Sequence, residues 1–240
     1  MSISSQDPQD FEKFILTFQE EGLGHDTCVQ EYGRSTAPNM YNECAVALEY
    51  KGPKYCADML AALISDKKNA LVLDVTAGTG LVGQQMHQRG FRKIDAHDGA
   101  AAMLESCKER GIYTNFINCF VGDGHNLPIW DDSYDALTCS GGTCENHLPP
   151  SAQAEFARVI KPGGFFVNAY RSTVADIEYG KRWEAEALRL EDEGKWTFYG
   201  RLLFRKYNLY SDGFVDIYQF DLMEQSELSV HSYCSNKSPQ

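Results

Sequence analysis

The strongest constraint on the fold is a regular alternation of apolar runs and helical patterns in the central part of the chain. Short runs rich in Val, Ile, Leu and Phe alternate with longer segments whose apolar residues recur at helical spacing. Parallel strands need a crossover long enough to hold a helix, and these segments are long enough. The alternation predicts an α/β fold, a three-layer, doubly wound and mostly parallel sheet with helices on both faces. The predicted strands are 70–76, 93–98, 115–123, 134–142 and 164–171, and the predicted helices are 81–90, 100–111, 150–160 and 175–194.

Both ends of the chain depart from this alternation. Two strand-like runs, 198–210 and 214–223, are separated by Ser-Asp-Gly, a spacing that predicts an antiparallel hairpin. Near the N-terminus, helical spacing predicts a helix at 10–21 and another from Pro53 onward, with a segment rich in turn-forming residues between them. We expect three parts: a helical lid at 1–66, a ligand-binding domain at 67–228 and a frayed tail at 229–240.

Composition and charge narrow the class of protein. The chain has 240 residues, of which 43% are hydrophobic, enough for one sizeable core. A formal net charge of −12 argues against a nucleic-acid partner, because phosphate contacts need a basic face. No apolar run is long enough for a membrane helix, and the N-terminus lacks the pattern of a secretory signal. The sequence therefore predicts a cytoplasmic protein and leaves its oligomeric state open.

The eight cysteines do not form a metal-binding pattern. They are scattered and include no C-x-x-C pair, which favours reduced thiols packed in a core. Cys139, Cys144 and His147 form C-x4-C-x2-H, but zinc sites use tighter pairs and a fourth ligand. We predict no metal site.

A glycine turn follows the first predicted strand. In "LVLDVTAGTGLVG", Gly78, Gly80 and Gly83 spell G-x-G-x-x-G, a pattern typical of dinucleotide-binding turns. Glycine lets the backbone approach a ligand closely, and ligands of doubly wound sheets bind beyond the carboxyl ends of the strands. The glycines alone do not identify the ligand, and Gly83 is better explained by close packing of the helix on the strand.

Three acids at successive strand ends indicate which ligand this is. Asp74, near the end of the first strand, would repel a pyrophosphate but attract a ligand with an ammonium or sulfonium group. Asp98 ends the second strand and could accept hydrogen bonds from ribose hydroxyls. Asp123 follows the third strand and could accept from an adenine amino group. Together they describe an adenosine joined to a cationic amino acid, which is S-adenosylmethionine.

The order of motifs resembles a known family. "VLDVTAGTG", "DAHDGAAAML", "VGDGHNLPI", "DDSYDAL" and "FARVIKPGGFF" are similar to the successive motifs of class I S-adenosylmethionine-dependent methyltransferases. "TAPNMYNECAVALEYKGP" and "ENHLP" further resemble the Williams-Beuren syndrome region methyltransferase-like proteins, although that branch's tryptophan is absent near Thr36 and Asn42 replaces its aspartate. The resemblance spans 32–220. It implies a methyl-transferring enzyme with a seven-stranded sheet whose last strand is inserted antiparallel.

The resemblance also implies a set of cofactor-binding residues. Asp74 would orient the glycine turn and the methionine amino group, and Asp98 would hold the ribose. The residues expected to bind the cofactor are Asp74, Ala77, Gly78, Thr79, Gly80, Asp98, Gly99, Gly122, Asp123, Gly124, Ser140 and Gly141.

Methyl transfer needs alignment more than acid–base chemistry, so the expected catalytic signature is weak. The segment "SGGTCENHLP" leaves the fourth strand where the methyl acceptor should lie, and it offers Glu145 and His147 as general base or substrate orienter. Tyr41 in the lid could contact the sulfonium through its ring, as could Tyr32. The plainer alternatives are a helix cap or a solvent-facing pair for Glu145 and His147, and ordinary lid packing for the tyrosines. Arg171 could bind a substrate carboxylate or pair with a protein acid.

A lid suits a small enclosed acceptor, and an acidic surface disfavours RNA or DNA. No N-P-P-Y or D-P-P-Y motif follows the fourth strand, which argues against methylation of an exocyclic base nitrogen. The alternatives are a protein methyltransferase, a non-catalytic S-adenosylmethionine-binding regulatory module, a dinucleotide-dependent oxidoreductase and an aminopropyl transferase.

Overall fold

Seven strands form a single sheet in residues 7–220, the part of the chain that the computed structural model describes. Their order is β3-β2-β1-β4-β5-β7-β6; β7 is antiparallel to both neighbours and the other pairings are parallel. This confirms the predicted fold class, including its antiparallel C-terminal hairpin. The strands are β1 Leu71–Val75, β2 Lys93–His97, β3 Phe116–Ile117, β4 Tyr134–Ser140, β5 Ile160–Arg171, β6 Thr197–Phe204 and β7 Gly213–Gln219.

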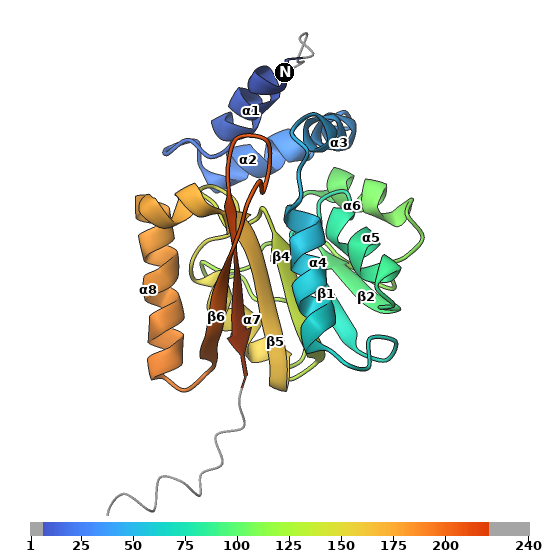
Figure 1. Cartoon of the computed structure of the whole chain (residues 1–240), viewed down its shortest axis with the longest axis vertical. Helices are drawn as coiled ribbons and strands as arrows, with labels where there is room; N and C mark the ends of the chain where they lie inside the picture. Colours follow the sequence, from blue (N-terminus) through green and yellow to red (C-terminus); the bar gives the residue numbers. More distant parts are fainter. Residues whose placement is uncertain (1–6, 221–240) are drawn as a thin grey trace, which may run out of the picture.

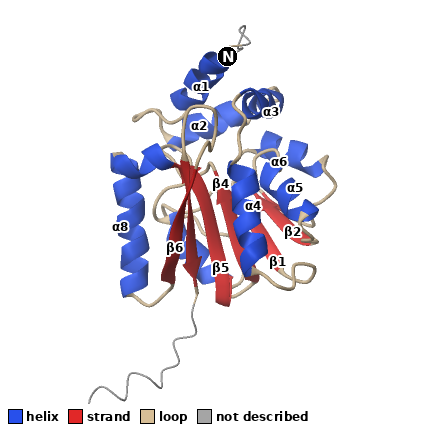
Figure 2. Ribbon diagram, in the orientation of Figure 1, coloured by secondary structure: helices blue, strands red, loops and turns tan. Residues whose placement is uncertain are grey.

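Helices cover both faces of the sheet, so the domain has three layers (Figure 2). Helices α4, α5 and α6 pack on one face, and α7 and α8 on the other (Figure 1). The helices are α1 Pro8–Thr17, α2 His25–Tyr32, α3 Ala37–Ala47, α4 Gly52–Leu63, α5 Leu81–Gln88, α6 Ala101–Lys108, α7 Ala152–Val159 and α8 Glu178–Asp192, with a 3-10 turn, η1, at Ser172–Asp176.

Strand β1 shows how the sequence builds this arrangement. Val72 packs in the cluster on the side of α4 and α5, whereas Leu73 and Val75 belong to the cluster on the side of α7 and α8. Side chains alternate along a strand, so a continuous apolar run can be buried only where both faces are covered. The central strands therefore need helices on both sides, and the carboxyl edge of the sheet is left to hold polar groups.

The first three helices form a cap that lies across the carboxyl ends of the strands (Figure 1). Arg171, at the end of β5, donates to both carboxylate oxygens of Glu12 in α1 at 2.5 and 2.9 Å. Asn146, in the loop after β4, accepts from the Gly24 N–H at 3.0 Å and donates to two backbone carbonyls of the α1–α2 connection. These polar contacts join the cap to the sheet.

Helices α2 and α3 lie in the segment rich in turn-forming residues, where the sequence predicted no individual helix. Neither helix carries a broad apolar stripe in its sequence. Their fully buried apolar contacts are few, and they include Cys28 and Cys44, each 1% exposed. Such short helices are stabilised by tertiary packing rather than by local propensity, so the sequence pattern underestimates them.

Two strand boundaries also differ from the prediction. Strand β3 is much shorter than 115–123, because the Asn118 amide donates to the carbonyls of Asp98 and Gly99 and the chain then leaves the sheet edge. Strand β6 ends at Phe204, and the connection to β7 is an eight-residue loop in place of a Ser-Asp-Gly turn. That loop reaches the end of the cap, where the Lys51 N–H donates to the Tyr207 carbonyl at 2.8 Å.

Within residues 7–220 no helix has the length and apolar character needed to cross a membrane. The predicted tail at 229–240 lies outside the described residues.

Candidate ligand-binding site

In the glycine turn between β1 and α5, two glycines have a left-handed backbone conformation. Gly78 and Gly80 have φ values of 56° and 84°, which glycine adopts without steric cost. Gly80 begins α5, and a Cβ added there would lie 2.9 Å from Arg110 Cδ and 3.0 Å from Cys107 Sγ. A larger residue at position 80 would therefore meet both backbone strain and α6.

Thr76 shares this left-handed conformation although it is β-branched. Its φ is 51°, a region that branched residues rarely adopt. Its hydroxyl donates to the Val75 carbonyl at 2.6 Å, and the residue lines the cavity described below. Thr76 is a site residue that the sequence reasoning missed; its position just before the two glycines was the signal that could have found it.

Asp74 is completely buried and points away from the glycine turn's open side. Its carboxylate accepts from the Tyr113 hydroxyl at 2.7 Å, the Thr138 hydroxyl at 3.1 Å and the Gly83 N–H at 3.2 Å. Burial raises the pKa of Asp74 to about 7 against these three donors. Asp74 thus ties β1 to α5 and β4, and it lies outside the cavities that adjoin the turn.

Asp98 connects the glycine turn to the start of α6. One carboxylate oxygen accepts from the Gly78 N–H and the other from the Ala100 N–H, each at 2.8 Å. Burial raises the pKa of Asp98, and the two backbone donors oppose that shift. A carboxylate has about four lone-pair positions, so two remain for hydroxyl groups of a ligand.

A cavity of about 720 Å³, here called the strand-end cavity, lies beside Asp98. It is bounded by the carboxyl ends of β1, β2 and β4 and is covered by α2 and α3 of the cap. The predicted site residues that line it are Gly78, Asp98, Gly99, Ser140, Gly141, Tyr41 and His147.

A second cavity of about 640 Å³, here called the cap cavity, lies between α1, α3 and the ends of β4 and β5. Its walls are largely aromatic and aliphatic, including Leu48, Tyr50, Tyr170 and Tyr207. The two cavities share four lining residues and therefore meet at them: Tyr32, Tyr41, Gly141 and His147.

The polar groups of the cap cavity are mostly satisfied by the protein itself. Arg171 lines the cavity but is paired with Glu12, which supports the ion-pair alternative over binding of a substrate carboxylate. The Tyr50 hydroxyl contacts the hydroxyls of Ser140 at 2.7 Å and Tyr207 at 3.1 Å. The cap cavity thus presents an apolar surface with its one lining cation already neutralised.

His147 lies where the two cavities meet, and its hydrogen bonds fix its tautomer. Nδ1 lies 3.0 Å from the Glu145 carbonyl, which can only accept, so Nδ1 carries the proton. Nε2 is then an acceptor and faces the Tyr32 hydroxyl at 3.3 Å. Burial lowers the pKa of His147, which keeps the ring neutral, and burial raises the pKa of Tyr32, which keeps its phenol protonated.

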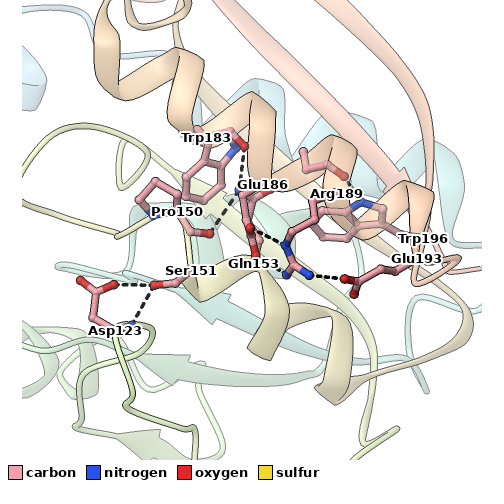
Figure 3. A network of polar contacts seen from close by, with 10 residues as sticks. Asp123, Pro150, Ser151, Gln153, Trp183, Glu186, Arg189, Glu193 and Trp196 are labelled. Atoms are coloured by element: carbon pink, nitrogen blue, oxygen red, sulfur yellow. Dashed lines mark hydrogen bonds and ion pairs between the residues drawn. The ribbon is translucent and has the colours of Figure 1, made fainter.

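Other predicted site residues lie outside both cavities. Glu145 forms an ion pair with Arg182 at 2.8 Å and lines neither of these two cavities. Asp123 accepts a hydrogen bond at 2.6 Å from the hydroxyl of Ser151, the residue just before α7 (Figure 3). The Thr79 hydroxyl donates to Asn42 Oδ1 at 2.7 Å and so joins the turn to α3. The remaining residues outside these two cavities are Ala77, Gly80, Gly122 and Gly124.

Comparisons with known proteins agree with this architecture. Residues 73–168 match the family described as Methyltransferase domain. The chain is 32% identical over 157 residues to Methyltransferase-like protein 27 of Homo sapiens, covering 65% of this chain and 63% of that protein. It is 35% identical over 116 residues to a demethylmenaquinone methyltransferase of Thermobifida fusca, covering 48% of this chain and 49% of that protein. The match thus spans less than two thirds of either relative.

A solved structure shows the same fold at low identity. A SAM-dependent methyltransferase from Leishmania major superposes with a TM-score of 0.59 and 14% sequence identity, covering 88% of this chain and 91% of that one. At this identity the likeness concerns the fold alone, because one fold can carry many reactions.

The strained conformation of Thr76 predicts an unusual order of stabilities. Thr76→Gly should be more stable than Thr76→Ala by about 1 kcal/mol, because only glycine avoids the left-handed penalty. Denaturant unfolding of the two variants measures the difference. The control is Ala154, an exposed residue of α7. There Ala154→Gly should be less stable than the wild type by about 1 kcal/mol, since glycine weakens a helix interior. Equal stabilities at position 76 would contradict the conformation described.

The buried carboxyl of Asp74 predicts a pH-dependent stability. Its pKa is raised from 3.8 to about 7 by burial, so the folded chain holds a proton that the unfolded chain releases between about pH 4 and pH 7. Its contribution is therefore most favourable near pH 4 and is lost as the pH rises towards 7. We expect the stability of Asp74→Asn to lack this decline, so the difference in unfolding free energy between wild type and variant should change by a few kcal/mol, on the order of magnitude that linkage gives, between about pH 4 and pH 7. A difference independent of pH would show that Asp74 is ionised throughout.

Proposed function

We propose that the chain is a class I methyltransferase that transfers the methyl group of S-adenosylmethionine to a small uncharged acceptor. The observation that carries this proposal is the junction of two cavities at Tyr32, Tyr41 and His147. One cavity is bordered by the glycine turn and Asp98, and the other is apolar and enclosed by the cap. A methyl donor in one cavity and a methyl acceptor in the other would meet where the cavities join. Bringing the two together is the main requirement for an in-line displacement.

The groups that line the strand-end cavity are suited to binding S-adenosylmethionine. Asp98 has lone pairs left for the two ribose hydroxyls, and Gly78, which has no side chain, allows close approach of the ligand to the backbone. Tyr41 lies against Gly78, where its ring can attract a positive charge. When bound, S-adenosylmethionine supplies a methyl group already activated by its sulfonium.

The lining of the cap cavity supports an uncharged acceptor. A carboxylate or phosphate would find Arg171 already paired with Glu12, and an ammonium would find no carboxylate among the lining residues. Burial of an unpaired charge is costly, whereas an aromatic or aliphatic body would be favoured by the tyrosines and Leu48. The name of the Thermobifida fusca relative, a demethylmenaquinone methyltransferase, is consistent with a small-molecule acceptor.

Tyr32 and His147 provide a route for a proton that the acceptor must lose. A hydroxyl in the cap cavity can donate to the Tyr32 oxygen while the Tyr32 proton moves to Nε2 of His147. The nucleophile keeps the electron pair of its O–H bond and would use it to bind the methyl group, whose bond to sulfur would break with its electron pair left on the sulfur. Nδ1 keeps its proton and its hydrogen bond to the Glu145 carbonyl. This hydrogen bond stabilises the imidazolium that forms.

Removing the carboxylate proposed to accept from the ribose should weaken cofactor binding without unfolding the chain. We expect Asp98→Ala to weaken S-adenosylhomocysteine binding by roughly a hundredfold, the value of two hydrogen bonds to a charged group. Titration calorimetry measures this, and Glu105→Ala, an exposed acid of α6, is the matched control with unchanged affinity. Unchanged affinity for Asp98→Ala would overturn the ribose assignment.

The proposed proton route predicts that variants of His147 and Tyr32 lose turnover but still bind the cofactor. After a screen of cell metabolites with a labelled methyl donor has identified the acceptor, His147→Asn should lower kcat by roughly a hundredfold or more. Tyr32→Phe should also lower kcat, while Glu145→Gln should not, because Glu145 faces Arg182 outside both cavities. S-adenosylhomocysteine affinity should stay within about twofold in all three. Normal turnover by His147→Asn would exclude this base, and label on protein alone would exclude a small acceptor.

A further inference from the structure

We propose that Nδ1 of His97 accepts a hydrogen bond from the exocyclic amino group of the cofactor's adenine. This inference rests on the proposed function, because it concerns the adenosine end of the same strand-end cavity. His97 ends β2, immediately before Asp98, and it lines that cavity. It was not among the residues that the sequence reasoning selected.

His97 is an acceptor without a donor in the described part of the chain. The residue is 2% exposed, and Nε2 lies 3.0 Å from the Cys119 carbonyl. Since a carbonyl only accepts, Nε2 carries the proton and Nδ1 is left with a lone pair. Nδ1 has no hydrogen-bond partner within residues 7–220. Burial lowers the pKa of His97 to about 4, so Nδ1 stays unprotonated across the physiological range.

The surroundings of His97 select the kind of donor that Nδ1 would meet. Met103, Cys119 and Val121 line the same cavity, so a flat apolar ring is favoured and an ammonium is not. The ribose hydroxyls have their own acceptor in Asp98, the next residue along the chain. The neutral amino group of adenine is the donor that remains.

Asp123, the acceptor predicted from the sequence for this amino group, is engaged elsewhere. Its carboxylate accepts from Ser151, and its own N–H donates to the Ser151 hydroxyl at 2.8 Å (Figure 3). Asp123 does not line the strand-end cavity, whereas His97 does. The structure thus favours the neutral imidazole of His97 over the carboxylate of Asp123 as the acceptor for the adenine amino group.

The test compares two ligands on the wild-type chain and on variants. The ligands are S-adenosylhomocysteine and its purine analogue, in which hydrogen replaces the 6-amino group. By calorimetry the wild type should bind the purine analogue about tenfold more weakly, the value of one hydrogen bond. His97→Phe should bind both ligands with equal affinity, and Asp123→Ala should keep the wild-type preference.

Each remaining outcome decides the question. The wild-type comparison needs no substitution, so equal binding of the two ligands overturns the inference even if His97→Phe does not fold. A preference that survives in His97→Phe also overturns the inference, and its loss in Asp123→Ala would assign the amino group to Asp123. Failure of wild type to bind S-adenosylhomocysteine would overturn the proposed function itself, together with this inference.

Discussion

The site depends on the contact between one carboxylate and two backbone N–H groups. Asp98 accepts from Gly78 in the glycine turn and from Ala100 at the start of α6, and it thereby fixes two loops that border the strand-end cavity. Without this contact both N–H groups would lose their partner, and the turn would have no fixed distance from β2. The same carboxylate keeps lone pairs for a ligand, so one residue both shapes the cavity and offers its strongest acceptor.

The cap turns an open sheet edge into an enclosed site. The Glu12–Arg171 ion pair, the hydrogen bonds of Asn146 and the Thr79–Asn42 contact join the cap to the strand ends. Because α2 and α3 bring Tyr32 and Tyr41 to His147, the two cavities share a boundary that neither the sheet nor the cap has alone.

The acids at the strand ends have different roles because their environments differ. Asp74 and Asp98 were both expected at the ligand, and the glycine pattern does not separate them. In the fold, Asp74 faces α5 and is fully occupied by three donors, whereas Asp98 borders the cavity. Strand direction alone places a residue at an edge; which face its side chain takes depends on the pleat and on the helix packed against it.

The sequence by itself determined the alternation of strands and helices from β1 to β7, the position of the glycine turn and the acid after β2. These features follow from short-range rules, namely hydrophobic period, backbone freedom of glycine and chain direction in a parallel sheet. Only the tertiary structure decided that Glu145 pairs with Arg182, that Arg171 is neutralised by Glu12, and that Nδ1 of His97 is buried without a hydrogen-bond donor in residues 7–220. Each of these depends on contacts between segments far apart in the chain, which no local pattern encodes.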